Sequence, residues 1–253
     1  MTSKKINSIR KTAQILSLFS RSAKLDVDEI SQALGMPKSS AYRYVKDLCA
    51  ESFLGYDASV KKYSVGPILL RLAANAIDGD PLREIAKPFM TNLARQTNET
   101  VFLTAVRGGH AVCIERIECT KNSIRFIVDR GDLFPLHASA IGRVLMAYLP
   151  KKEQEKVIAK GLEKITPATI IDPVKLKKAL EQVRRNGFCY SDQELNPGGR
   201  CVAAPIFDSS GKVVGGLGIA VPVYRFPESQ VKEVQEAILK CTRTISSKLG
   251  YRP

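Results

Sequence analysis

Residues Leu25 to Tyr63 constrain the fold most strongly, because they encode two short helices separated by a tight turn and followed by a hairpin. Asp26 can accept a hydrogen bond from the backbone near Glu29, as in a capping box at a helix start. Gly35 ends this helix and Pro37 pre-sets the next one. This order of elements is typical of small domains that place one helix in the DNA major groove.

The second of these helices has an apolar and a polar side at about 100° per residue. The apolar side gathers Ala41, Val45, Leu48 and Cys49. On the polar side, Arg43 has the donor geometry for bidentate contact with a guanine edge. Serines near the helix N-terminus are short enough to reach bases or phosphates. The residues predicted to contact DNA here are Lys38, Ser39, Ser40, Tyr42, Arg43 and Lys46.

Elements on either side complete a winged helix-turn-helix. Segments 53–56 and 62–65 are strand-like and enclose a hairpin whose tip should bring Lys61 and Lys62 to phosphates. A first helix is expected to pack beneath the pair and to expose Arg10, a further DNA-contacting candidate. Its expected packing residues are Ile9, Ala13, Leu16 and Phe19. The competing interpretation is a small helical core whose charges are only solvated.

Two motifs resemble the IclR-type family of bacterial transcriptional regulators. The run Gly35–Arg43 resembles the entry to that family's recognition helix, and Gly66 resembles the end of its wing. Far downstream, the stretch from Gly187 to Asp208 is similar to the family's C-terminal signature at every defined position. Because the two motifs occur in the right order about 150 residues apart, chance is a poor explanation for both.

Composition excludes several classes of protein. With 44% apolar residues, a chain of 253 residues can bury the cores of two domains. No apolar run approaches the roughly 20 residues of a membrane span, and the N-terminus lacks an apolar signal core, so we expect a cytoplasmic protein without a membrane partner. Six scattered cysteines predict reduced thiols. The presence of only two histidines argues against a zinc cluster but leaves open a looser cysteine-based metal or redox sensor; no cofactor is predicted.

The formal charge of +14 suggests a polyanionic partner, but it is spread over the whole chain. Residues 1–65 contain 11 Lys and Arg against 6 Asp and Glu, which is a net of +5. The remaining 188 residues contain 28 against 19, which is a net of +9. The excess could steer the protein toward DNA or favour acidic small molecules, although a surface charge run is most often a solvated face.

Gly66 and Pro67 mark a domain boundary, which divides the chain into a DNA-binding domain (1–66), a linker helix (67–80) and an effector-binding and oligomerisation domain (81–253). An apolar stripe along the linker, made of Leu69, Leu72, Ala73 and Ala76, predicts a dimer contact. Asp80 and Pro81 begin the next helix as N-cap and first-turn residue, and Pro88 is expected to kink it.

The C-terminal part predicts an α+β domain with an antiparallel sheet. Strands are expected over 100–106, 111–117, 124–128, 202–207 and 213–221, with a turn over 107–110. Helices are expected over 139–148, 151–160, 173–186 and 228–249. The family resemblance implies that this domain has a GAF-like sensor fold.

The resemblance also implies a pocket over the sheet for a small effector, often a carboxylic acid. Carried across by position, it places Phe126 and Phe134 on an apolar wall, Ala140 and Ile141 at a helix start, and Ser191 and Cys201 on an opposing loop, with Glu194 nearby. Backbone N–H groups at a helix N-terminus favour an anion, and Ser191 adds a hydroxyl donor. Ser191 replaces the aspartate of many relatives and Ile141 is bulkier than usual, so a relative's ligand should not be copied.

Two other functions remain open from the residues alone. In an enzyme, Cys201, His137 and Glu194 could supply nucleophile, base and orienting acid, although no nucleophile-elbow, phosphate-loop or metal spacing supports this. In a constitutive DNA-binding protein, the C-terminal domain would serve only oligomerisation. The favoured interpretation is a non-enzymatic, ligand-responsive regulator, more often a repressor, that binds a palindromic operator as a dimer or a pair of dimers.

Overall fold

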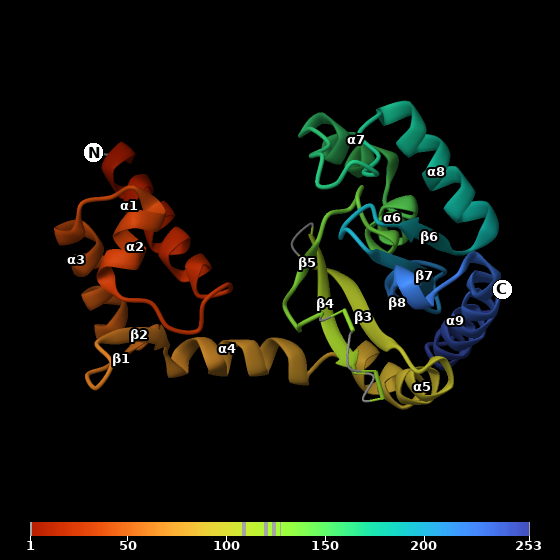
Figure 1. Cartoon of the computed structure of the whole chain (residues 1–253), viewed down its shortest axis with the longest axis horizontal. Coiled ribbons are helices and arrows are strands. Elements are labelled where there is room, and N and C mark those ends of the chain that lie inside the picture. The colour runs from red at the N-terminus through yellow and green to blue at the C-terminus, as the bar shows by residue number, and fades with distance from the viewer. Residues whose placement is uncertain (1, 108–109, 119–120, 123–124, 127, 253) are drawn as a thin grey trace. The chain divides into compact units, whose positions relative to one another are not determined.

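The computed structural model describes residues 2–107, 110–118, 121–122, 125–126 and 128–252. The chain divides into two units, Met1–Gly79 and Asp80–Pro253, and each is considered by itself. The first unit holds the predicted order of three helices and a hairpin, followed by a further helix (Figure 1). The second holds a six-stranded sheet with helices on both faces.

The first unit has a small core beneath its helix-turn-helix. Its elements are α1 (Thr2–Leu18), α2 (Val27–Leu34), α3 (Lys38–Ala50), β1 (Leu54–Asp57) and β2 (Lys62–Val65). The expected packing stripe of α1 was wrong in part, since Ile9 is 75% exposed and Ala13 is exposed. Phe19 is buried as expected, but Ile15 is fully buried in place of Ile9 and Ala13, because the face of α1 that meets α2 and α3 is rotated from the expected one.

The turn between α2 and α3 follows from its caps. The Asp26 side chain accepts from the backbone N–H groups of Asp28 and Glu29, and the Glu29 carboxylate accepts from the Asp26 N–H at 2.7 Å, which completes the predicted capping box. Gly35 ends α2 with a φ of 57°, in the left-handed region that glycine adopts without strain. Pro37 then occupies the N-cap of α3.

The hairpin is tied back to the start of α2. Leu25 and Tyr63 exchange backbone hydrogen bonds of 3.0 and 2.7 Å, which adds an isolated bridge beside β2. At the other end of the hairpin, Gly66 has its Cα against the backbone of Ser52, and a Cβ there would lie 2.3 Å from the Ser52 carbonyl oxygen. Glycine is therefore required where the chain leaves the wing.

Helix α4 (Pro67–Asp78) follows, and its described side chains are mostly exposed. Leu70 is 63% exposed and Leu72 51% exposed, so the apolar side chains of this helix are not covered within one chain. In the second unit, α5 (Pro81–Thr97) begins as predicted, with the Asp80 side chain accepting from the Leu82 N–H, and Pro88 lies inside the helix.

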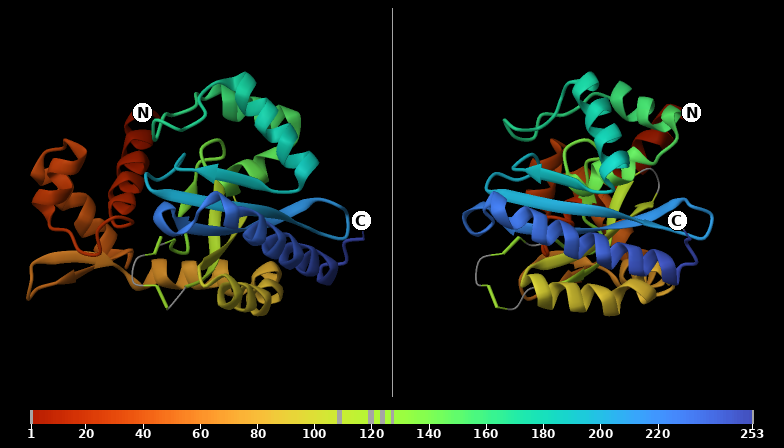
Figure 2. Two further views of the ribbon diagram at one scale, coloured as in Figure 1. Left: turned by 45° about the vertical axis from the view of Figure 1, so that its right-hand side comes forward. Right: turned by 90° about the vertical axis from the view of Figure 1, so that its right-hand side faces the viewer.

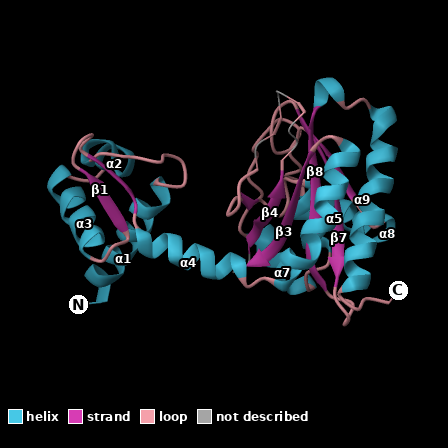
Figure 3. Cartoon of the chain, turned by 90° about the horizontal axis from the view of Figure 1, so that it is seen from below, coloured by secondary structure: helices cyan, strands magenta, loops and turns pink. Residues whose placement is uncertain are grey.

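All pairs in the large sheet are antiparallel, in the order β5-β4-β3-β8-β7-β6. The strands are β3 (Thr100–Arg107), β4 (His110–Ile117), β5 (Leu133–Phe134), β6 (Cys189–Asp192), β7 (Gly199–Phe207) and β8 (Val213–Pro222) (Figure 3). The predicted strand over 124–128 was wrong for Arg125, Phe126 and Val128, which are in no strand; residues 124 and 127, and residues 108–109 of the predicted turn, lie outside the described residues.

Helices cover both faces of this sheet (Figure 2). Helix α5 lies beside α9 (Glu228–Lys248) on one face, over inward side chains such as Leu103, Ala204 and Leu217. The other face carries α6 (Ala140–Ala147), α7 (Lys151–Ala159) and α8 (Pro173–Asn186), over Phe102 and Ala203. The alternation along β3 and β7 therefore divides the core into two layers.

Candidate DNA-binding surface and small-molecule cavity

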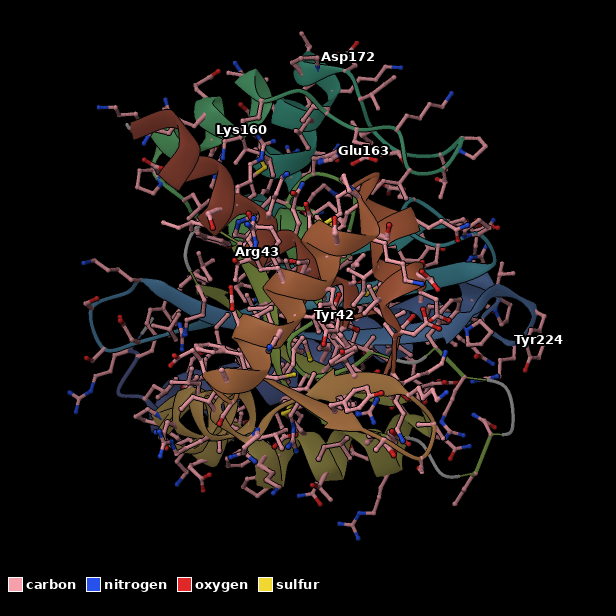
Figure 4. All side chains as sticks on the ribbon, turned by 90° about the vertical axis from the view of Figure 1, so that its left-hand side faces the viewer. Tyr42, Arg43, Lys160, Glu163, Asp172 and Tyr224 are labelled. Carbon is pink, nitrogen blue, oxygen red and sulfur yellow. The ribbon has the colours of Figure 1, made fainter. Side chains whose placement is uncertain are left out.

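The polar side of α3 is exposed as predicted. Ala41, Val45 and Leu48 are buried, whereas Tyr42 and Arg43 point away from that core (Figure 4). The Arg43 guanidinium lies 5.7 Å from the centre of the Tyr44 ring, and no ion pair engages it within the described part of the chain. Of the remaining candidates on α3, Lys38, Ser39 and Lys46 are exposed and Ser40 is half-buried.

Two of the lysines predicted to contact DNA have carboxylate partners. Lys38 pairs with Asp28 at 2.7 Å, and Lys62 pairs with Glu29 at 2.9 Å. Lys62 is not at the hairpin tip, because it lies in β2 opposite Asp57. Of the two lysines, Lys61 is the one at the tip, with a φ of 53°. Arg10 is exposed on α1.

The Lys62 contact links the wing to α2. The Asp26 N–H and the Lys62 ammonium together lower the pKa of the Glu29 carboxyl, and Glu29 in turn raises the pKa of Lys62. Glu29 thus serves both the capping box and the wing. Lys62 therefore has a structural role that its sequence position did not reveal.

In the second unit a cavity lies between the sheet and the start of α6. Its volume is about 50 Å³, counted as the space open to the centre of a water molecule. Six of the seven predicted effector residues line it, namely Phe126, Phe134, Ala140, Ile141, Ser191 and Cys201. The other lining residues are Phe102, Val128, Ser139, Leu195, Asn196, Gly199, Arg200 and Ala220.

Strand register explains how distant residues meet at this cavity. Ser191 pairs with Cys201 across β6 and β7, and Cys201 pairs with Ala220 across β7 and β8. The three side chains therefore form one row across the sheet, on the face that α6 covers. Ser191 and Cys201 lie on strands rather than on the loop that we expected.

Aromatic rings form the apolar wall. Phe102 and Phe134 stack with ring centres 5.3 Å apart and planes at 17°. The Phe126 ring lies against the Cα of Gly199, where a Cβ would come within 2.6 Å of the ring. This wall suits a small apolar or ring-bearing body.

The cavity lining also includes residues with hydrogen-bond donors. The Ser139 hydroxyl caps α6 by accepting from the Gly142 N–H at 3.0 Å, while the N–H groups of Ala140 and Ile141 have no acceptor within the described residues. Ser191 is only 4% exposed, and its hydroxyl likewise has no partner among the side chains and backbone that the structure describes. Three donors from two elements are thus available to an oxyanion.

Glu194 does not line the cavity, contrary to the prediction. Its carboxylate accepts from Arg143 on α6, with Nη2 to Oε1 at 2.8 Å, and the Arg143 side chain is 3% exposed. Arg200, which does line the cavity, pairs with Asp192 through two hydrogen bonds of 3.1 and 2.9 Å.

The residues of the enzymatic alternative have other partners. His137 Nε2 lies 2.9 Å from the Glu163 carbonyl oxygen, and Glu194 is held by Arg143. Burial raises the pKa of the Cys201 thiol to about 12, so it stays protonated at neutral pH. The five cysteines that the structure describes are free, and no group of three possible metal ligands occurs among the described residues.

Two family models match the chain. Residues 8–58 match the model of the IclR helix-turn-helix domain, and residues 74–247 match that of the bacterial transcriptional regulator IclR C-terminal domain. The chain belongs to the IclR family. It is therefore a DNA-binding transcriptional regulator with a helix-turn-helix and a C-terminal IclR sensor domain.

Relatives cover nearly the full length. The chain is 34% identical to the HTH-type transcriptional regulator KipR of Bacillus subtilis, over 98% of each protein. It is 33% identical to the HTH-type transcriptional repressor AllR of Escherichia coli, over 89% of this chain and 83% of AllR.

Solved structures share the fold. The IclR of Thermotoga maritima superposes with a TM-score of 0.75 at 29% identity, covering 97% of this chain and all of that one. An IclR homologue of Microbacterium hydrocarbonoxydans complexed with 4-hydroxybenzoate has a TM-score of 0.78 at 22% identity, with 96% and 98% covered. In the described residues of this regulator no helix is long and apolar enough to cross a membrane.

Proposed function

We propose that this regulator binds a small carboxylate in the cavity of its C-terminal domain and that occupancy changes its affinity for an operator. The observation that supports the proposal is the set of three donors without acceptors among the described residues, namely the N–H groups of Ala140 and Ile141 and the hydroxyl of Ser191, a residue that is 4% exposed. A buried donor without a partner costs free energy unless a ligand or water satisfies it. We propose that the oxygens of a bound carboxylate accept from these donors.

The ligand body is proposed to be compact and apolar. The stacked rings of Phe102 and Phe134 and the edge formed by Phe126 offer contact on an apolar surface, whereas Cys201 contributes a neutral thiol. The complex of the Microbacterium homologue with 4-hydroxybenzoate supports an aromatic acid as one candidate. The bulk of Ile141, which is fully buried, favours a smaller acid.

For DNA, we propose that Arg43 reads a base edge while Ser39, Ser40, Tyr42 and Lys46 contact bases and phosphates around it. Lys61 and Arg10 are proposed as phosphate contacts, because both are exposed. Lys38 and Lys62 remain candidates whose carboxylate partners must release or share them. The domain limits 1–66, 67–80 and 81–253 are proposed to separate these roles.

A homodimer is proposed because helix α4 exposes Leu70 and Leu72, which a second copy can cover. Two DNA-binding units match a palindromic operator. The repressor AllR among the relatives supports repression as the mode of action, and we place the protein in the cytoplasm without catalytic activity. Turnover of a small acid that is lost in Cys201→Ala would favour the enzymatic alternative.

Calorimetric titration of small acids tests the effector site. Wild type should bind at least one of formate, pyruvate, benzoate and 4-hydroxybenzoate, and Ser191→Ala should weaken that binding by about 1.5–3 kcal/mol, the usual contribution of a hydrogen bond to a charged group. Ser247→Ala, at an exposed serine of α9, is the matched control. No heat with any acid, together with unchanged operator binding, would favour a constitutive DNA-binding protein.

A further inference from the structure

Arg143 contacts several of the elements that supply the cavity lining without lining the cavity itself. It lies in α6, one turn after Ala140, and its side chain is 3% exposed. Its guanidinium donates to Glu194, to the Tyr190 carbonyl oxygen at 3.1 Å and to the His137 carbonyl oxygen at 3.4 Å. Its Nε lies 3.3 Å from the Cys189 sulfur.

These contacts connect the elements that supply the three donors. His137 leads into α6, where Ala140 and Ile141 present their N–H groups, and Tyr190 precedes Ser191 in β6. One planar side chain therefore spans the helix start and the strand. The fixed fork geometry of arginine suits such bridging, whereas lysine offers a single point charge.

Glu194 extends the connection to the segment 193–198, between β6 and β7, of which Leu195 and Asn196 line the cavity. Thr166 and Thr169 donate to the backbone oxygen of Glu194 at 3.2 and 2.7 Å. Both the carboxylate and the backbone of Glu194 are thus held from outside the cavity.

A buried ion pair contributes little net stability compared with apolar side chains of similar volume, so stability alone does not account for it. We infer that Arg143 and Glu194 are positioning residues that hold the start of α6, strand β6 and the segment 193–198 in the geometry that binds the effector. This inference rests on the proposed function. The pair touches the cavity's walls through other residues and does not itself contact the ligand.

Glu194→Gln tests the inference, because it keeps the shape of the side chain and removes its charge. The matched control is Glu115→Gln, since Glu115 likewise pairs with a buried arginine, accepting from Arg83 at 2.8 Å, but lies outside the cavity. Arg143→Lys is the second variant, which keeps the positive charge and loses the fork. Each is compared by amide hydrogen exchange without ligand and by titration with the acid that binds wild type best.

In Glu194→Gln and Arg143→Lys we expect faster exchange over residues 137–142 and 189–199 and an acid dissociation constant raised about tenfold. Glu115→Gln should leave both readouts of the cavity near wild type. Wild-type exchange and affinity in both cavity variants would overturn the inference. If no acid binds wild type but the exchange rises as expected, the proposed effector function fails and the positioning role stands.

Discussion

The DNA-facing helix and the cavity differ in how far apart along the chain their residues lie. The exposed candidates on α3 all fall within Lys38–Lys46, and a helical period orders them. The cavity draws on residues from Phe102 to Ala220, in strands β3, β5, β6, β7 and β8 and in α6. A local surface can therefore be deduced from periodicity, whereas the cavity depends on strand register across the whole sheet.

The largest expected effect is on stability and comes from Gly142→Ala, which alters the cavity side of the molecule and leaves helix α3 unchanged. In Gly142→Ala the new Cβ would lie 2.2 Å from the Pro135 carbonyl oxygen, so the start of α6 must shift. We expect destabilisation of the second unit by about 3 kcal/mol, at the upper end for overpacking, measured by urea unfolding. Gly79→Ala is the control, because nothing lies within 4 Å of its Cβ position; equal stability of the two variants would contradict the close approach.

Arg43→Ala should weaken DNA binding by helix α3 and leave the cavity unchanged. The loss of a base contact should cost about 1–3 kcal/mol at the operator and relax specificity, measured by fluorescence anisotropy with operator and scrambled duplexes. Arg21→Ala removes the same charge outside α3 and should weaken both duplexes alike. Unchanged operator affinity in Arg43→Ala would refute the base contact.

The stability of the first unit should depend on pH through Glu29 of its capping box. The pKa of Glu29 is lowered below its usual 4.5 by the Asp26 N–H and by Lys62, so the folded state holds fewer protons than the unfolded state around that pH. The hydrogen bonds of ionised Glu29 therefore stabilise the folded state fully above the pKa of the unfolded state. This contribution is lost as the pH falls through the lower pKa of the folded state. Melting curves from pH 7 to 3 should show the difference between wild type and Glu29→Gln shrinking with acid; a constant difference would contradict the linkage.

The smallest expected effect is a difference between the two lysines of the hairpin, Lys61 and Lys62, in the salt dependence of operator affinity. Lys61→Ala should reduce the slope of operator affinity against salt by about 0.9, as expected for one lost phosphate contact. Lys62→Ala should change this slope less, because Glu29 already holds that ammonium at 2.9 Å. An equal reduction of the salt slope in the two variants would instead indicate that both lysines contact DNA phosphates.

The same contrast explains what could be predicted from the sequence. The capping box at Asp26, the left-handed Gly35 and the helices of both units follow from local rules. The packing face of α1 could not be predicted, since Ile9 and Ile15 have the same side chain and only tertiary contact distinguishes them. Strands β5 and β6, of two and four residues, are too short for a periodic signal.

Within the cavity, the family resemblance supplied six of the fourteen lining residues, and the residues alone supplied none of that set. Glu194 was misplaced because its partner, Arg143, lies 51 positions away and no local pattern joins them. Phe102 was missed because an inward phenylalanine in a strand has the same pattern whether it lines a cavity or fills a core. Leu195 and Asn196 lie between two strands, where no periodic pattern marks them as lining residues.

Operator affinity with and without a bound acid tests the central claim most directly. With the best-binding acid at saturation, we expect the wild-type operator dissociation constant to change by about 5- to 150-fold, and that of Ser191→Ala to change little at the same concentration. An acid that binds the cavity, as shown by its loss of affinity for Ser191→Ala, yet leaves the wild-type operator constant unchanged would contradict the account.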